Sequence, residues 1–229
     1  MDETQNAGAG SKNMFTGTFN LSNYDTAGAE VRVDFDYVMH GTPRIADGNA
    51  VYVRAYDTLP WTQAYVYDLA AYPGSLVHVK SLSLTDAIRM TGRNFSTGSQ
   101  VAFGQNDTSL IAAPAYGNGL TIDNFRLYTV TNDVALESIV APLPSNCGLS
   151  GLQPVVVKVH NGVNHTLYNV QLYYNMDGGA TFTGTIDSIQ AKTTINYTFA
   201  QQINPGLGVT HNLNTWLSVA GDSYKANDT

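Results

Sequence analysis

Apolar and polar residues alternate along the first half of the chain. The segment 31–37 reads Val-Arg-Val-Asp-Phe-Asp-Tyr, with an apolar residue at every second position. Because neighbouring side chains in a β-strand point to opposite faces, this period of two predicts a strand with one buried face and one polar face. Similar runs predict further strands at 51–56, 61–67, 77–79, 101–103 and 120–128.

The second half restarts this pattern after a short polar seam at residues 129–132. A valine-rich run at 155–160 ends at the Asn-Gly dipeptide 161–162, which strongly favours a tight hairpin turn. Short strands at regular spacing over about 100 residues are typical of a β-sandwich. The sequence therefore predicts two domains, 1–131 and 132–229. Strands of the second domain are expected around 134–136, 170–174, 181–186, 193–199 and 215–220.

The composition fits this pattern and predicts the fold class. Thr, Val, Tyr, Asn, Ser and Gly are abundant, whereas only 13% of the 229 residues are charged. β-Branched and aromatic residues favour strands, and helices of soluble proteins usually carry Glu and Lys on their exposed faces. We therefore expect an all-β chain. The lone Cys147 cannot form an intrachain disulfide, so the fold has to be held together by its cores.

The charge balance argues against one class of partner. The formal net charge is −7, with only 11 Lys and Arg residues, and nucleic-acid binding needs a basic face that displaces counterions. No apolar run approaches the length of a membrane-spanning helix. Residues 2 and 3 are acidic, unlike the basic start of a signal peptide. We expect a chain that neither binds nucleic acid nor inserts into a membrane.

The sequence carries no recognisable catalytic motif. The Gly-x-Ser-x-Gly pattern of a nucleophile elbow is absent. The five histidines are scattered, with no pair at the spacing of zinc ligands on a helix. Glycosidases use two carboxylates across a cleft, but the three glutamates, Glu3, Glu30 and Glu137, occupy peripheral positions. We predict that this chain is not an enzyme.

Four short motifs occur together in the first half. They are Val-Asp-Phe-Asp-Tyr at 33–37, Ala-Asp-Gly-Asn at 46–49 leading into 51–53, Trp61, and Ile-Asp-Asn-Phe-Arg-Leu at 122–127. Together they resemble the jelly-roll modules of the MAM and cleaved-adhesin type, found in large secreted proteins of Bacteroidota. The last motif is the most specific, because that family closes on an Ile-Asp-Asp/Asn-apolar pattern. The resemblance implies a jelly-roll β-sandwich for residues 1–131.

Motifs of the second half are similar to those of the CARDB-like, fibronectin-like sandwiches that follow such modules. They lie at 133–136, 146–149, 155–162, 221–222 and 227–229. The similarity implies an immunoglobulin-like β-sandwich for residues 132–229. In that family the segment ending in Asn-Asp-Thr leads into a final apolar strand, whereas this sequence stops at Thr229. We expect a sandwich without its last strand, either as a fragment of a longer protein or with an edge that another segment fills.

A calcium site is the sharpest chemical expectation. Ca²⁺ takes about six to eight oxygen ligands, and the resemblance to jelly-roll modules implies two of them: Asp123 on the closing strand and Asp47 in the loop before the second strand. Asp36 and Asn49 are weaker candidates. In the alternative interpretation, Asp123 only caps a bulge and Asp47 only turns a hairpin.

A group of aromatic residues suggests glycan binding. Trp61, Tyr65, Tyr67 and Tyr72 lie close together in the sequence, and exposed aromatic rings stack on sugars. The alternative is that alternating aromatics on a strand belong to the core and to cross-strand pairs.

Three Asp-Ser/Thr-apolar tripeptides resemble the sites at which Bacteroidota attach sugars to secreted proteins. Their acceptor residues are Thr26, Thr58 and Ser188. Chance, together with the preference of these residues for turns, is the alternative explanation.

The resemblances imply a non-catalytic fragment of a modular adhesin that is exported by the type IX route to the cell surface. Its role would be surface or glycan attachment, such as that used in gliding. The implied partners are a surface polysaccharide or another extracellular ligand, and neighbouring modules of the same long chain. Two alternatives remain: a carbohydrate-binding accessory module of a larger secreted hydrolase, and a purely structural stalk segment.

Overall fold

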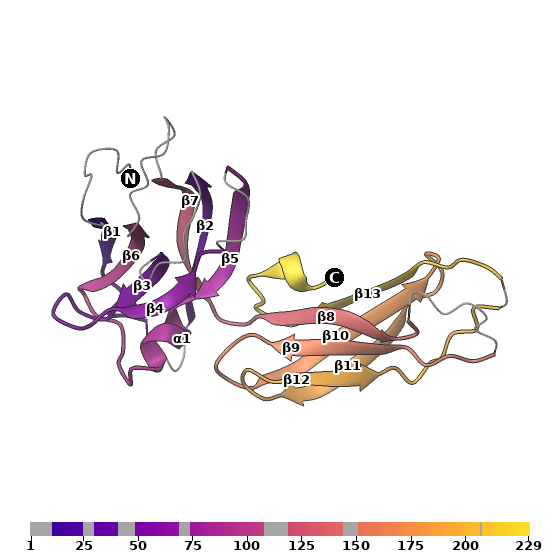
Figure 1. Ribbon diagram of the computed structural model, residues 1–229. Coiled ribbons are helices and arrows are strands. Elements are labelled where there is room, and N and C mark those ends of the chain that lie inside the picture. Colours follow the sequence, from indigo (N-terminus) through magenta and orange to yellow (C-terminus); the bar gives the residue numbers. More distant parts are fainter. Residues whose placement is uncertain are drawn as a thin grey trace. The chain divides into compact units, whose positions relative to one another are not determined.

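The computed structural model describes residues 11–24, 30–40, 49–68, 74–107, 119–143, 151–206 and 208–229. Strands dominate these ranges, which confirms the prediction of an all-β chain (Figure 1). The chain divides into two compact units, Met1–Thr129 and Val130–Thr229, called unit 1 and unit 2 below. Within the described ranges, no helix is long and apolar enough to cross a membrane.

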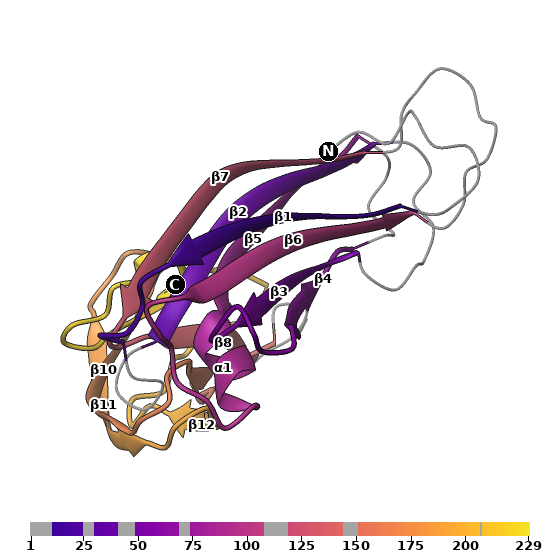
Figure 2. The ribbon, with the colours of Figure 1, turned by 90° about the vertical axis from the view of Figure 1, so that its left-hand side faces the viewer.

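The described strands of unit 1 form two sheets (Figure 2). The first has the strand order β1-β6-β3-β4, with β1 Ser11–Phe19, β6 Ser99–Asp107, β3 Ala50–Arg54 and β4 Thr62–Val66. The second has the order β5-β2-β7, with β5 Leu76–Ser83, β2 Glu30–His40 and β7 Gly119–Val130. A four-stranded sheet therefore packs against a three-stranded one.

The core of unit 1 lies between these two sheets. The apolar face that the sequence predicts for β2 is fully buried, with Val33, Phe35 and Tyr37 at 0–1% exposure. The Phe35 ring meets the Phe103 ring of β6 edge to face, at 5.1 Å between centroids. Aromatic pairs of this geometry stabilise a core beyond the area that they bury. Alternation in the sequence thus identified the buried apolar face of β2 correctly.

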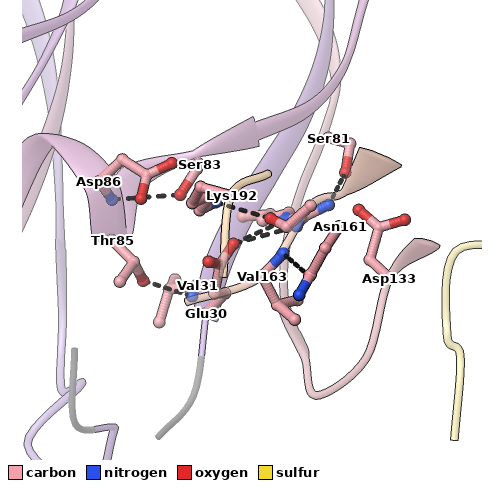
Figure 3. A network of polar contacts seen from close by, with 12 residues as sticks. Glu30, Val31, Ser81, Ser83, Thr85, Asp86, Asp133, Asn161, Val163 and Lys192 are labelled. Atoms are coloured by element: carbon pink, nitrogen blue, oxygen red, sulfur yellow. Dashed lines mark hydrogen bonds and ion pairs between the residues drawn. The ribbon is translucent and has the colours of Figure 1, made fainter. Parts of the chain in front are cut away.

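A short helix interrupts unit 1 and was not predicted. Helix α1, Leu84–Arg89, follows β5 directly. Ser83 caps its N-terminus, because the Ser83 side chain accepts a hydrogen bond from the Asp86 backbone N–H at 3.1 Å (Figure 3). The Thr85 hydroxyl accepts a hydrogen bond from the backbone N–H of Val31 at 2.7 Å, which ties the helix to β2.

Two sheets are also formed by the strands that the structure describes in unit 2. One has the order β11-β10-β13, with β11 Phe182–Ile189, β10 Leu167–Met176 and β13 Leu213–Ser218. The other has the order β12-β9-β8, with β12 Thr194–Thr198, β9 Val156–Asn161 and β8 Val134–Ala141. Their buried side chains include Val157 and Val159 of β9 and Leu172 and Tyr174 of β10, as period-two alternation requires.

Asn161 does more than start the predicted turn. Its fully buried side-chain amide donates hydrogen bonds to the carbonyls of His165, Ile189 and Gln190 at 2.8–3.0 Å. Its carbonyl oxygen accepts one from the Val163 backbone N–H at 3.0 Å (Figure 3). One amide side chain therefore satisfies backbone groups from three places in the chain.

The residues after β13 return to the start of β8. Asn132 and Asp222 form a parallel β-bridge, and a 3₁₀ turn, η1 Lys225–Asn227, follows. The Asn227 amide donates a hydrogen bond to the Asp133 carboxylate at 2.8 Å. The C-terminal segment is thus fixed to the first strand of unit 2.

Candidate functional site

The polar face of β2 is buried together with its apolar face. Arg32, Asp34 and Asp36 have 3–8% exposure although they alternate with the core residues. Arg32 forms an ion pair with Glu30 at 3.0 Å and donates a hydrogen bond to the Ser81 hydroxyl at 2.6 Å. Side chains from the two neighbouring strands therefore cover this row of charges.

Two strained backbone positions flank this row. Ser81 on β5 and Asn124 on β7 have positive φ angles of 56° and 53°, which non-glycine residues seldom adopt. The Ser81 backbone N–H donates to Asp34 at 2.7 Å, and the Asn124 amide donates to Asp36 at 2.7 Å. Each of these two residues is thus held by one aspartate of β2, which stabilises its unusual backbone conformation.

Asp36, a predicted calcium ligand, uses both of its oxygens in these contacts. Oδ1 lies 2.7 Å from His78 Nδ1 and 3.7 Å from Lys80 Nζ, and Oδ2 accepts the Asn124 hydrogen bond. The hydrogen bonds from Asn124 and His78 hold the pKa of Asp36 below its usual value. A cation at Asp36 would have to displace these donors.

The other predicted calcium ligands that the structure describes, Asp123 and Asn49, do not form a preformed metal site. Asp123 is exposed and accepts a hydrogen bond from the Asn124 backbone N–H at 2.7 Å. Asn49 is buried, and its backbone carbonyl accepts a hydrogen bond from the Tyr67 N–H. Asp47 falls outside the described residues. Within the described ranges no group of three His, Cys, Asp or Glu side chains is arranged to hold a metal ion.

The predicted glycan-binding aromatics are distributed between core and surface. Tyr67 is only 2% exposed, and its ring packs 5.0 Å from that of Tyr37. Burial raises the pKa of the Tyr67 hydroxyl. Tyr65 is half-buried and joins the same cluster, with its ring 6.2 Å from that of Tyr67. Both tyrosines therefore contribute to packing inside unit 1.

Trp61 has one ring face occupied by the protein itself. The Arg54 guanidinium lies 4.2 Å from the centre of the Trp61 ring, a cation–π contact, and Gln100 fixes the guanidinium through a 2.6 Å hydrogen bond. Tyr72 falls outside the described residues.

Two of the three predicted modification sites are described, and both are exposed. Thr58 lies in the turn after β3, and Ser188 lies near the end of β11. Thr26 falls outside the described residues. An accessible hydroxyl next to an aspartate is thus present at two of the three predicted positions.

The sequence did not reveal an apolar groove in unit 1. Its volume is about 500 Å³, and it opens between the outermost strands of the two sheets. We call it the apolar groove; it is lined by Phe15, Gly17, Phe19, Val101, Phe103, Leu120, Ile122 and Phe125. These side chains come from β1, β6 and β7.

The spacing of residues on β1 helps to form the apolar groove. Phe15, Gly17 and Phe19 lie on one face of the strand, and the missing side chain of Gly17 leaves room for the Phe19 ring. A Cβ atom added to Gly17 would lie 2.8 Å from the Phe19 ring. Any larger residue at Gly17 would therefore shift the Phe19 ring and fill part of the groove.

Large apolar side chains reach solvent at the mouth of the apolar groove. Phe15 is 64% exposed and Phe125 is 38% exposed. The Phe125 ring stacks on that of Phe19 at 5.9 Å and meets that of Phe103 edge to face at 5.8 Å. The lining residues within the described ranges are apolar side chains and one glycine, so the apolar groove is suited to binding an apolar group.

The chain matches no protein-family model and no curated protein. The case for its function therefore depends on the geometry of its described residues.

Proposed function

We propose that this chain is a non-catalytic part of a modular extracellular adhesin. Unit 1 would be a jelly-roll binding module, and unit 2 an immunoglobulin-like module that follows it in the sequence. The all-β architecture and the short motifs of the sequence support this proposal, as does the apolar groove. A stalk segment, by contrast, gives no reason for a groove that exposes phenylalanine to water.

The apolar groove is the observation that carries the proposal. Ligand sites usually have volumes of about 300–1,000 Å³ and are lined mainly by apolar and aromatic side chains. The apolar groove has a volume of about 500 Å³ and four phenylalanines in its lining. A ligand that buries about 200 Å² of apolar surface there would gain roughly 5 kcal/mol from the hydrophobic effect. We therefore propose that unit 1 binds an apolar group presented by a partner.

The second candidate is glycan binding by unit 2, and one observation favours it. Tyr173 of β10 and Trp216 of β13 are direct cross-strand partners whose rings stack at 5.5 Å. Asn214 donates a hydrogen bond to Asn175 beside them at 3.0 Å. Aromatic rings together with amide groups are the side chains that bind sugars, through stacking and hydrogen bonds. This face would suit the accessory module of a polysaccharide-degrading protein.

Fluorescence of anilinonaphthalene sulfonate, a dye that brightens in apolar sites, tests the main proposal. The wild-type chain should bind the dye at one saturable site, and Gly17→Leu should weaken that binding at least tenfold by filling the groove. Gly98→Ala is the matched control, because a Cβ at Gly98 has no atom nearer than 3.9 Å. Thermal melts should first show that Gly17→Leu and the wild type are both folded. Equal dye binding by the two proteins would then refute the apolar groove as a binding site.

A further inference from the structure

We infer that the Asn161-Gly162 dipeptide is a latent deamidation site. The folded state of unit 2 suppresses the reaction there, and the reaction makes unfolding of that unit irreversible. Asn-Gly is the dipeptide at which asparagine loses its amide most readily in a flexible chain, because glycine has no side chain to hinder the attack. This site lies in unit 2 and does not depend on the apolar groove.

Deamidation at this dipeptide is an intramolecular reaction. The backbone nitrogen of Gly162, after giving up its proton, attacks the side-chain carbonyl carbon of Asn161. The new nitrogen–carbon bond closes a cyclic succinimide, and the side-chain nitrogen leaves as ammonia. Water then opens the ring at either of its carbonyl groups and releases a proton, which leaves aspartate or isoaspartate at position 161. Water is the only further reactant.

The folded state holds the reacting side chain in place. Asn161 is fully buried, with 0% exposure. Its amide nitrogen donates hydrogen bonds to the carbonyls of His165, Ile189 and Gln190 at 2.8–3.0 Å. Its oxygen accepts a hydrogen bond from the Val163 backbone N–H at 3.0 Å (Figure 3). Ammonia can therefore leave only after the hydrogen bonds of the amide nitrogen have broken.

The attacking nitrogen is held in the same way. The Gly162 N–H donates a hydrogen bond to the backbone carbonyl of Asp133, just before β8, at 2.9 Å. The Asn161 N–H donates one to the backbone carbonyl of Thr193, just before β12, also at 2.9 Å. The attack requires loss of the Gly162 proton and hence of its hydrogen bond. Deamidation of Asn161 therefore has to wait until this end of β9 opens.

The product does not fit the place that asparagine leaves. An ionised carboxylate only accepts hydrogen bonds, whereas three backbone carbonyls surround the amide nitrogen of Asn161. The carboxylate would put a buried negative charge next to their oxygens, which is strongly unfavourable. Isoaspartate also routes the main chain through the side-chain carbon, which shifts the pairing of β9 with β8 and β12. An unfolded chain that has reacted therefore does not return to the native state.

A second Asn-Gly dipeptide, at 118–119, provides an internal reference. Asn118 lies outside the described residues. In a denatured chain, both asparagines precede glycine and meet the same solvent, so they should react at similar rates. The rate at Asn118 in urea therefore gives the rate expected at Asn161 without protection by the fold.

Peptide mapping by mass spectrometry tests the suppression on the whole 229-residue chain. In concentrated urea at mildly alkaline pH, Asn161 and Asn118 should deamidate at similar rates. In native buffer the rate at Asn161 should be lower by at least about a hundredfold, because a stable unit is unfolded for about one part in a thousand of the time or less. Equal rates at Asn161 in native buffer and in urea would overturn the inference.

Refolding after ageing in urea tests the irreversibility. Aged chains are diluted into native buffer, and compact and expanded chains are separated by size exclusion. The compact chains should retain the amide at Asn161, and chains deamidated there should be found in the expanded fraction. If both fractions carry the same proportion of aspartate and isoaspartate at position 161, deamidation does not prevent refolding and the inference is wrong.

The variant Asn161→Asp reproduces one of the products without ageing. Asn196→Asp is the matched control, because it adds the same charge at an exposed asparagine of β12. In thermal melts, Asn161→Asp should lower the transition of unit 2 by about 10 °C or more, since buried hydrogen bonds are lost. The control should shift it by about 3 °C at most. A melting temperature of Asn161→Asp equal to that of the control would contradict the inference.

Discussion

The side chains of β2 show how much of their burial can be predicted from the sequence of one strand when its neighbouring strands are unknown. Alternation in the sequence identified Val33, Phe35 and Tyr37 as buried, and the structure confirms this. The same pattern assigned Asp34 and Asp36 to a polar face, yet both are buried. The reason is that Tyr128, His78 and other side chains of the flanking strands close over them. The residue pattern of one strand does not say which strands lie next to it, so it could not predict that these aspartates are covered.

Substitution of Asn161 should lower the free energy of unfolding of unit 2 by a large amount for so small a side chain. Asn161→Ala would leave the backbone groups that its side chain now satisfies without their partner, and each unsatisfied buried group costs about 1–3 kcal/mol. We expect the free energy of unfolding of unit 2 to fall by roughly 3 kcal/mol or more, measured by urea denaturation. Asn196→Ala, at an exposed asparagine of β12, serves as the control in the same unit. A loss below about 1 kcal/mol for Asn161→Ala would contradict this assignment.

Asp228 should make the stability of unit 2 depend on pH. Burial, together with the negative charges of Asp222 and Asp133, raises the pKa of Asp228 to about 6. Its Oδ1 is buried and accepts no hydrogen bond. Because the folded state favours the protonated form, the resulting stabilisation is complete below the ordinary pKa of 3.8 and is lost as the pH rises through about 6.

The variant Asp228→Asn isolates this effect. Its melting temperature should equal that of the wild type near pH 4 and exceed it at pH 7, as measured by thermal melts across this range. Parallel curves for the two proteins between pH 4 and pH 7 would show that Asp228 does not titrate in this range.

Among the elements, the strands were predictable and helix α1 was not. Strands need only four or five alternating residues to give a signal, whereas α1 has six residues, fewer than two full turns of helical periodicity. Its signals are local: Ser83 at the cap, Asp86 in the first turn and Arg89 in the last. Those residues also occur in turns, so the sequence alone did not distinguish the two.

The apolar groove could not be predicted for a different reason. The alternation of Phe15, Gly17 and Phe19 is the ordinary pattern of a buried strand face. Whether such a face is covered depends on which strand ends up at the edge of each sheet, and this is decided by pairings between residues far apart in the sequence. β1 pairs with β6, for example, which lies more than 80 residues later.

At the scale of the whole molecule, calcium remains a prediction that a thermal melt can test. If Asp123 and Asp47 bind Ca²⁺, calcium should raise the melting temperature of one transition, and excess EDTA should reverse the shift. A ligand at about 100 times its dissociation constant adds roughly 2.7 kcal/mol to stability. Asp123→Asn should abolish the shift. If calcium and EDTA leave every transition unchanged, Asp36 and Asp123 serve only to hold the backbone and side chain of Asn124.

The bridge between Asn132 and Asp222 has a mechanical consequence for unit 2. The two segments run in parallel, and further hydrogen bonds join them, from the Ser223 N–H to the Asn132 carbonyl and from the Val134 N–H to the Asp222 carboxylate. A tensile force that draws residues 130 and 229 apart would slide one segment along the other. These bonds would then carry the load in shear and have to break together, so unit 2 would resist stretching more than a module whose ends peel apart one bond at a time.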